Sequence, residues 1–264
     1  MNNMFKSLII MAAITLFYWG QPTQANAQGL TERDLPAVLE KILQEHPELV
    51  LDVLRQNSEA VLDIAQQGSN VRRKRNLEAQ WKQDMKTPKK VALEDRPVLG
   101  NAGAKVRIVA FSDFTCHFCR QASQSLTGLL NQYGKDVSLV FKHFPMDEDG
   151  ISARASRYFI AIGMQDAAKA WQFHDILFAQ RDALLGQGDA FLKKTAEGLG
   201  VDMKRLNKDL RSRKVSTILA EDIKDAQALG VEGTPHFLVN DLVVRGALPA
   251  DLFKAAIDMA RKGK

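Results

Sequence analysis

The feature that most constrains this chain is its cysteine content: it has two cysteines, Cys116 and Cys119, three positions apart. A structural disulfide stabilises mainly by closing a long loop in the unfolded chain, and two intervening residues give little of that effect. A structural zinc site usually needs four ligands, and the sequence has no second C-x-x-C or closely spaced histidine pair to complete one. If the chain enters an oxidising compartment, the remaining explanation is redox chemistry.

The N-terminus has the three parts of a secretory signal peptide. Lys6 is the only charge in the first 28 residues, an apolar run covers residues 8–19, and Ala25-Asn26-Ala27 matches an A-x-A cleavage site. A membrane anchor is the alternative, but twelve apolar residues are fewer than the roughly 20 that a bilayer core needs. We expect residues 1–27 to be removed, which leaves an exported, periplasmic protein.

Composition and charge exclude several classes. The chain is 45% hydrophobic and 25% charged, the range of ordinary globular proteins, with a net charge of +5. Much of the surplus lies in residues 71–90, which contain eight Lys and Arg but only two acidic residues, Glu78 and Asp84. Because export removes nucleic acid as a partner, we interpret this stretch as a solvated helix face. No phosphate-binding glycine loop is present, so no nucleotide cofactor is expected.

Residues 31–66 show the periodicity of short amphipathic helices. Thr31 with Asp34 resembles a capping box, and later helix starts are expected near Pro47 and Ser58. Helices this short cannot bury their apolar stripes alone, so the stripes pack either on the main domain or on a second chain. We favour the second chain and predict a helical oligomerisation module over residues 28–70. Residues 71–104 are predicted to be a basic helix and a linker.

From residue 105 the sequence shows the strand and helix patterns that are typical of an α/β domain. The predicted order is a strand over 106–111, a helix to about 133, a strand over 137–142, three or four helices within about 150–229, strands over 236–240 and 243–245, and a helix from about 249. An α/β domain over residues 105–264, interrupted by a helical insertion at about 150–229, is the simplest architecture for this order.

The pattern around the cysteines predicts different roles for the two sulfurs. A helix that begins at Cys116 places its sulfur at the positive end of the helix dipole, which favours the thiolate. Cys119 lies one turn further along the same face and is the expected resolving thiol. His117 could stabilise the thiolate or be an exposed residue without an electrostatic role. Phe118 is expected to contact substrate rather than enter the core.

The strand followed by Phe111-Ser112-Asp113-Phe114-Thr115-Cys116-His117-Phe118-Cys119 resembles the thioredoxin superfamily. The helical insertion and the later Gly233-Thr234-Pro235 are similar to its exported DsbA and DsbC relatives, over about residues 98–264. The resemblance implies a thioredoxin-like fold, with Cys116 attacking, Cys119 resolving, and Thr234 and Pro235 forming a substrate-binding loop with a cis proline. It implies no metal and no cofactor beyond the Cys116–Cys119 disulfide.

Two departures from monomeric DsbA favour isomerase or dual isomerase and oxidase activity. Thr234 stands where monomeric DsbA oxidases typically carry valine, and is similar to DsbC-type isomerases. The N-terminal module resembles the segment of oligomeric DsbA-like proteins, and a homodimer is favoured over a trimer. The implied partners are unfolded or misoxidised secreted proteins and a DsbD-like or DsbB-like membrane redox partner. The alternatives are a monofunctional DsbA-like oxidase, or a holdase or metal-handling binding protein.

Four further residues have open roles. Asp113 is either a buried acid that shuttles protons during exchange or a cap for the following helix. His143 and His174 are expected to be structural or surface histidines. His236 follows Pro235 and is therefore expected nearer the redox site.

Overall fold

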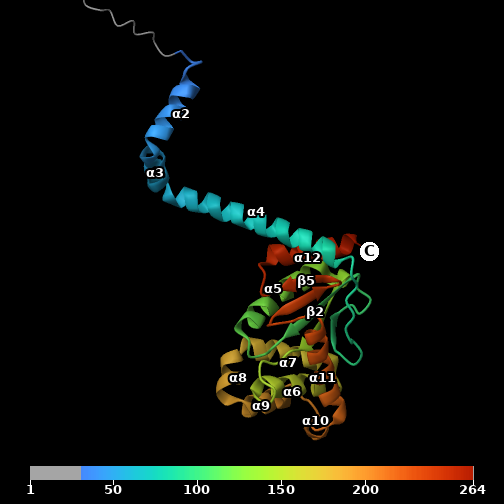
Figure 1. Cartoon of the computed structure of the whole chain (residues 1–264). Coiled ribbons are helices and arrows are strands. Elements are labelled where there is room, and N and C mark those ends of the chain that lie inside the picture. Colours follow the sequence, from blue (N-terminus) through green and yellow to red (C-terminus); the bar gives the residue numbers. More distant parts are fainter. Residues whose placement is uncertain (1–30, 264) are drawn as a thin grey trace, which may run out of the picture. The chain divides into compact units, whose positions relative to one another are not determined.

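The computed structural model describes residues 31–263 and divides the chain into two compact units after Gln67. Figure 1 shows the course of the chain, with the elements labelled as in the text. The signal peptide predicted over residues 1–27 lies outside the described residues. None of the helices between residues 31 and 263 combines the length and the apolar character that crossing a bilayer requires.

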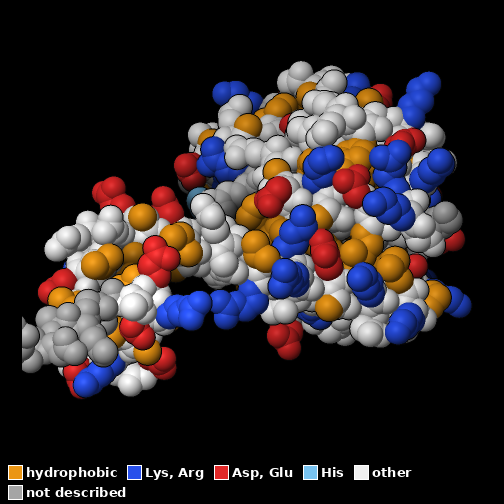
Figure 2. All heavy atoms as spheres, turned by 90° about the horizontal axis from the view of Figure 1, so that it is seen from above, with side chains coloured by type: hydrophobic (Ala, Val, Ile, Leu, Met, Phe, Trp, Pro, Cys, Tyr) orange, Lys and Arg blue, Asp and Glu red, His pale blue; other side chains and the backbone are white. Residues whose placement is uncertain are grey.

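The smaller unit consists of α2 (Leu35–Glu45), α3 (Pro47–Gln56) and the first part of α4 (Ser58–Asp84). The expected cap is present, because both the backbone N–H and the hydroxyl of Thr31 donate to the Asp34 carboxylate, at 3.1 and 2.6 Å. In α2 and α3 as described, no side chain is buried. The exposed large apolar residues of this unit are Leu35, Leu39, Ile42, Leu43, Leu49, Val50, Leu51, Val53, Leu54, Leu62 and Ile64, visible as orange surface on the smaller body in Figure 2.

The second part of α4 belongs to the larger unit and packs into its core. Trp81 is fully buried, and its indole N–H donates to the Val243 carbonyl at 2.9 Å. The Asp84 carboxylate accepts from the Val243 N–H at 3.0 Å. Val243 lies on an edge strand, so α4 covers backbone groups that would otherwise be open to pairing with another chain.

The sheet of the larger unit has five strands in the order β1-β3-β2-β4-β5. β2 and β3 pair in parallel through the crossover helix α5, and the other neighbouring pairs are antiparallel. The strands are β1 (Val98–Gly100), β2 (Val106–Ser112), β3 (Val137–His143), β4 (His236–Val239) and β5 (Leu242–Arg245); α5 spans His117–Tyr133, and a short 3-10 turn, Gly134–Asp136, leads into β3.

The predicted linker within residues 71–104 is corrected by β1, which pairs with β3 from Val98 opposite Val140 to Gly100 opposite Ser138. Gly100 has a φ of +89°, and a Cβ there would lie 2.9 Å from the Val137 carbonyl oxygen. The proline and glycine content that suggested a linker therefore reflects, at Gly100, a close approach of two strands.

A buried ion network ties the segment before β1 to the rest of the larger unit. The Lys142 ammonium is fully buried and lies 2.7 Å from Asp222, 2.8 Å from Asp225 and 2.8 Å from the Ala92 carbonyl. Arg96 donates to Asp222 at 2.9 and 3.1 Å. Each buried charge is thus paired and hydrogen-bonded, which is the condition for burying charges at a tolerable cost.

Both faces of the sheet are covered because side chains alternate along its strands. In β2, Ile108 and Ala110 join the main core, which is shared with α5, α7 (Ala167–Ala179) and the C-terminal helix α12 (Ala250–Lys262). Val109 and Phe111 point to a second cluster on the other face, together with Ala226 of α11 (Arg213–Ala228). The near-continuous apolar sequence of β2 follows from this two-sided burial.

The insertion contains six helices, where three or four were expected. Short polar caps start three of them: Asp166, Asp202 and Ser212 each accept from backbone N–H groups of the first turn. Gly188, at a φ of +54°, separates two more. The helices are α6 (Ile151–Gly163), α7 (Ala167–Ala179), α8 (Arg181–Gln187), α9 (Asp189–Gly198), α10 (Met203–Asp209) and α11 (Arg213–Ala228).

Candidate active site

Cys116 lies at the junction between β2 and α5 and is the N-cap residue of that helix. Its backbone is extended, and its sulfur accepts from the Cys119 N–H at 3.3 Å. Cys116 is half-buried, whereas Cys119 is buried with 2% of its surface exposed. Both carry free thiols. The Cys116 residue is thus partly accessible to solvent, whereas Cys119 is not.

The loop before Cys116 is fixed from three sides. One oxygen of Asp113 accepts from the Thr115 N–H and hydroxyl, at 2.6 and 2.7 Å. The other oxygen accepts from the Met146 N–H at 2.8 Å. The Arg181 guanidinium of α8 donates to the Thr115 carbonyl at 2.6 Å. These bonds make Asp113 a residue that holds the loop, and they connect the helical insertion directly to the redox turn.

The Thr234–Pro235 bond is cis, and Thr234 lies beside the redox pair. The Cys116 thiol donates to the Thr234 carbonyl at 3.5 Å, although the two residues are 118 positions apart. The structure therefore brings Cys116, Cys119 and Thr234 together, as the family resemblance implied.

The surroundings shift the pKa values of the two thiols in opposite directions. A hydrogen bond from the Cys119 thiol is the largest of the effects that lower the pKa of Cys116, to about 6, and bonds from Thr234 and from the backbone of Cys119 and Phe118 add to it. Burial opposes this shift but does not outweigh it. Burial is also the main cause that raises the pKa of the Cys119 thiol, followed by its hydrogen bond to Cys116. A thiolate is the nucleophile in disulfide exchange, so the lowered pKa of Cys116 is what an attacking cysteine requires.

The two residues between the cysteines point outward. The His117 ring lies 3.1 Å from the Gln121 side-chain amide, one turn along α5. The groups that lower the pKa of Cys116 are the Cys119 thiol, the Thr234 side chain and the backbone of Cys119 and Phe118. Stabilisation of the thiolate by His117 therefore stays a prediction. Phe118 is 59% exposed, which leaves its ring free for a contact with substrate.

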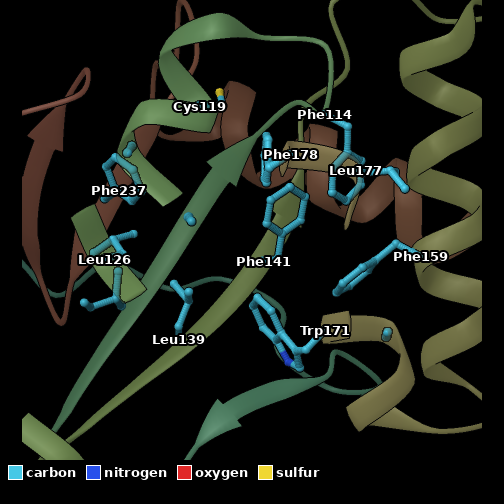
Figure 3. Close-up of a cluster of buried hydrophobic side chains, with 14 of the residues drawn as sticks. Phe114, Cys119, Leu126, Leu139, Phe141, Phe159, Trp171, Leu177, Phe178 and Phe237 are labelled. Carbon is cyan, nitrogen blue, oxygen red and sulfur yellow. The ribbon is translucent and has the colours of Figure 1, made fainter. Parts of the chain in front are cut away.

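The three other predicted histidines are buried. His143 and His174 lie among aromatic rings. The centroid of the His174 ring is 4.8 Å from that of Phe178 and 5.1 Å from that of Phe141; Figure 3 shows these two phenylalanines. His236 pairs with Phe111 across β4 and β2, and burial lowers the pKa of its imidazole to about 4. His174 and His143 also have lowered pKa values, again because of burial. All three are neutral at neutral pH.

The sequence interpretation missed Arg181 and the serines near Cys119. Arg181 lies 65 positions after Cys116 in one of the short helices of the insertion. No local pattern marks it, because its contact with Thr115 depends on how the insertion packs. Ser112 ends β2 and lines the same small cavity as Cys119. A serine at the end of a strand that is apolar apart from Arg107 is a sequence signal that points to Ser112.

Comparison with known proteins agrees with this geometry. The family model described as Thioredoxin matches residues 92–259. Over 167 residues the chain is 31% identical to the Na(+)/H(+) antiporter NhaA of Herminiimonas arsenicoxydans, which covers 63% of this chain and 26% of the antiporter. The chain thus spans about a quarter of the length of the curated relatives it matches.

Two solved structures extend the comparison. A thioredoxin-like oxidoreductase from Silicibacter pomeroyi DSS-3 superposes with a TM-score of 0.57 at 30% identity, over 64% of this chain and 94% of that one. Proteus mirabilis ScsC in a transitional conformation superposes with a TM-score of 0.58 at 19% identity, over 88% of this chain and 98% of that one. At that lower identity the second match concerns the fold alone. The predicted thioredoxin-like fold with preceding helices is confirmed.

Proposed function

The chain belongs to the thioredoxin family, whose model matches residues 92–259, and on that premise we propose that it is an exported protein thiol–disulfide oxidoreductase. The observation that carries this proposal is the asymmetry of the redox pair. Cys116 is partly accessible and its thiol has a pKa lowered to about 6, whereas Cys119 is buried and its pKa is raised. No bound cofactor is needed, because the Cys116–Cys119 pair itself accepts and donates electrons.

We propose disulfide isomerisation, alone or beside oxidation, as the reaction. The Cys116 thiolate attacks a wrong disulfide of a secreted protein, and the substrate sulfur that leaves takes up a proton. The resulting mixed disulfide is resolved by another substrate thiol, or by Cys119, which releases the substrate sulfur and closes the Cys116–Cys119 disulfide. Thr234, beside the attacking sulfur, supports the isomerase assignment through its similarity to the DsbC type. In an oxidase the Cys116–Cys119 disulfide would instead be donated to a reduced substrate.

We propose that isomerisation, unlike oxidation, requires oligomerisation through the smaller unit. The smaller unit supports the idea because its leucine, isoleucine and valine side chains are exposed along α2 and α3. Several exposed apolar side chains on short helices are typical of a surface that a partner covers. We assign that partner to a second copy of this chain, with a homodimer favoured over a trimer.

The remaining partners follow from the chemistry. Unfolded or misoxidised secreted proteins are the proposed substrates, and Phe118, Thr234 and Pro235 are the proposed contacts for them. A DsbD-like membrane reductant would keep Cys116 reduced for isomerisation, and a DsbB-like oxidant would serve the oxidase reaction. Export rests on the signal peptide predicted over residues 1–27.

Refolding of scrambled ribonuclease tests the proposal. We expect the chain from residue 28 to recover ribonuclease activity, and a variant without residues 28–67 to oxidise reduced ribonuclease without rescuing the scrambled form. If neither form rescues scrambled ribonuclease but both oxidise the reduced enzyme, the protein is an oxidase. A variant with both Cys116 and Cys119 replaced by serine separates the binding alternative, because a holdase or metal-handling protein would keep its binding activity.

A further inference from the structure

Resolution by Cys119 raises a question about a proton. In a mixed disulfide the Cys116 sulfur is bonded to the substrate sulfur and is no longer a free thiolate that accepts a hydrogen bond. Cys119 must lose its proton before its sulfur attacks Cys116, and burial makes that loss unfavourable. With 2% of its surface exposed, Cys119 has little direct contact with solvent. The proton therefore needs a route through the protein interior.

A small cavity lies directly beside Cys119. Its volume of about 10 Å³ corresponds to roughly one water molecule. Three polar side chains, those of Ser112, Ser123 and His174, line it together with the Cys119 sulfur. Apolar residues close the rest of the wall, and Figure 3 shows five of them near Cys119: Leu126, Leu139, Phe141, Phe178 and Phe237. A water molecule at this position would have the two to four polar partners that buried water requires.

A second, larger pocket shares part of its lining with this cavity. It has a volume of about 280 Å³ and lies between α5, β1 and β3. Ser123, Leu139 and His174 line both spaces, so they form the partition between them. Asn131 and Asp175 are on the outer side only. Ser123 and His174 are thus the polar residues common to the inner cavity, which Cys119 lines, and the outer pocket.

His174 has the properties of a proton carrier in this partition. Its Nδ1 lies 2.8 Å from the Asp175 carboxylate, whose side chain is 68% exposed. Burial lowers its pKa, so the ring is neutral at neutral pH and has one nitrogen able to accept a proton. The titratable groups that face it are Asp175 on its own helix, His143 of β3, which senses its charge, and Cys119 across the inner cavity.

We propose that Ser123 and His174 form a proton relay between Cys119 and solvent, through a water molecule in the inner cavity. This inference rests on the proposed redox function of the pair. When Cys119 resolves a mixed disulfide, its proton passes to the relay, its sulfur bonds to Cys116, and the bond between Cys116 and the substrate sulfur breaks. Over the two exchange steps the Cys116–Cys119 pair loses two electrons and the two sulfurs of the substrate disulfide gain them, the second of which leaves here as a thiolate. In the oxidase direction the relay returns a proton to Cys119.

A small aromatic disulfide, dithionitrobenzoate, separates the two chemical steps in a rapid-mixing experiment on the reduced chain. The first coloured thiolate is released when Cys116 attacks the reagent, and the second when Cys119 resolves the mixed disulfide. We expect Ser123→Ala and His174→Gln to leave the first phase unchanged and to slow the second by about 10²-fold, because positioned acid–base groups contribute at least about that much. Added imidazole should restore the second phase of His174→Gln.

Ser125→Ala is the matched control, because Ser125 lies on the same helix and donates to the Gln121 carbonyl outside both cavities. An unchanged second phase in Ser123→Ala and His174→Gln, or an equal loss in Ser125→Ala, overturns the relay. If His174→Gln does not fold, Ser123→Ala decides alone, since Ser123 is only partly buried. A wild-type chain with both phases that leaves scrambled and reduced ribonuclease unchanged would refute the proposed function and not the relay.

Discussion

At the scale of single residues, the redox pair works through an unequal sharing of hydrogen bonds. The Cys116 sulfur receives the Cys119 N–H, and the Cys119 thiol and the Thr234 side chain stabilise its charge. The Cys119 thiol acts as a donor to Cys116 and packs among the apolar side chains of the core. The same three-residue spacing therefore produces one sulfur that is ionised near neutral pH and one that keeps its proton.

The ionisation of Cys116 is directly measurable. We expect the thiolate absorbance near 240 nm to titrate with a midpoint of about 6. Cys119→Ala should raise the midpoint most, because it removes the largest stabilising bond, and Thr234→Val should raise it less. A wild-type midpoint above about 8, close to the value of a free cysteine, would contradict this account.

The lowered pKa of Cys116 also determines the direction in which the stability of the reduced chain changes with pH. The folded thiolate forms at a lower pH than that of an unfolded cysteine, whose pKa is near 9.0. Its contribution to the stability of the reduced chain is complete above about pH 9 and is lost as the pH falls through about 6. The disulfide form has no such group, so this contribution favours the reduced form as the pH rises.

The reduction potential should follow the same titration. Below a pH of about 6 the reduction of the disulfide takes up two protons, and above it only one, because Cys116 stays ionised. We therefore expect the potential to fall by about 59 mV per pH unit below that point and by about 30 mV above it. Equilibration with glutathione buffers from pH 5 to 8 would measure both slopes. A single slope across this range would mean that Cys116 is not ionised near neutrality.

Some residues of this site can be predicted from short contiguous motifs, and others cannot. Cys116, Cys119 and their helix start follow from four adjacent residues, and the loop at Thr234 follows from a short motif. Arg181 and Ser123 have no such signature, because their roles depend on packing between elements that are far apart in the chain. His174 was expected to be a structural or surface histidine, since an isolated histidine in an apolar helix carries no sign of the cavity that it lines.

At the scale of elements, the α/β order was predictable because strand and helix periodicities differ clearly. The two departures have local causes. Capping residues such as Asp166 and Asp202 divide the insertion into six helices. Gly100, where β1 and β3 approach closely, made the sequence of β1 resemble a linker. The role of α4 was less predictable, because its polar sequence gives no sign of how deeply Trp81 is buried.

Trp81 offers a test of that role. We expect Trp81→Ala to lower the free energy of unfolding by about 3–5 kcal/mol, through lost burial and the cavity left behind. It also removes the bond to the Val243 carbonyl on the edge strand. Val71→Ala on the same helix is the control: its side chain is 51% exposed, and the change should stay within about 0.5 kcal/mol. Urea unfolding followed by circular dichroism would measure both. Equal effects would mean that α4 is not part of the core.

At the scale of the whole molecule, the proposed isomerase activity depends on what covers the apolar side chains of α2 and α3. Burying them against a second copy would remove them from water, and the hydrophobic effect would drive the association. The catalytic fold has its own core and its own ion network, so it does not depend on this contact for stability. Loss of association should therefore change the reaction that the protein performs, and not the chemistry of Cys116.

A double variant, Leu39→Glu with Val53→Glu, tests this separation. Both side chains are more than half exposed in the single chain, at 57% and 59%, so the substitutions should not disturb the folding of a monomer. Charges at a covered apolar contact are costly to bury, and we expect light scattering to show the mass of one chain where the wild type shows two. Reaction of Cys116 with dithionitrobenzoate should be unchanged, and rescue of scrambled ribonuclease should be lost.

The matched control adds the same charges at polar positions of the same two helices, as Gln44→Glu with Gln56→Glu. This variant should keep both the oligomeric mass and the isomerase activity, because exposed glutamines can carry charge without desolvation. If the Leu39 and Val53 variant keeps the mass of the wild type, these helices do not hold the chains together. If it becomes monomeric and still rescues scrambled ribonuclease, isomerisation requires only the asymmetric thiol pair and Thr234.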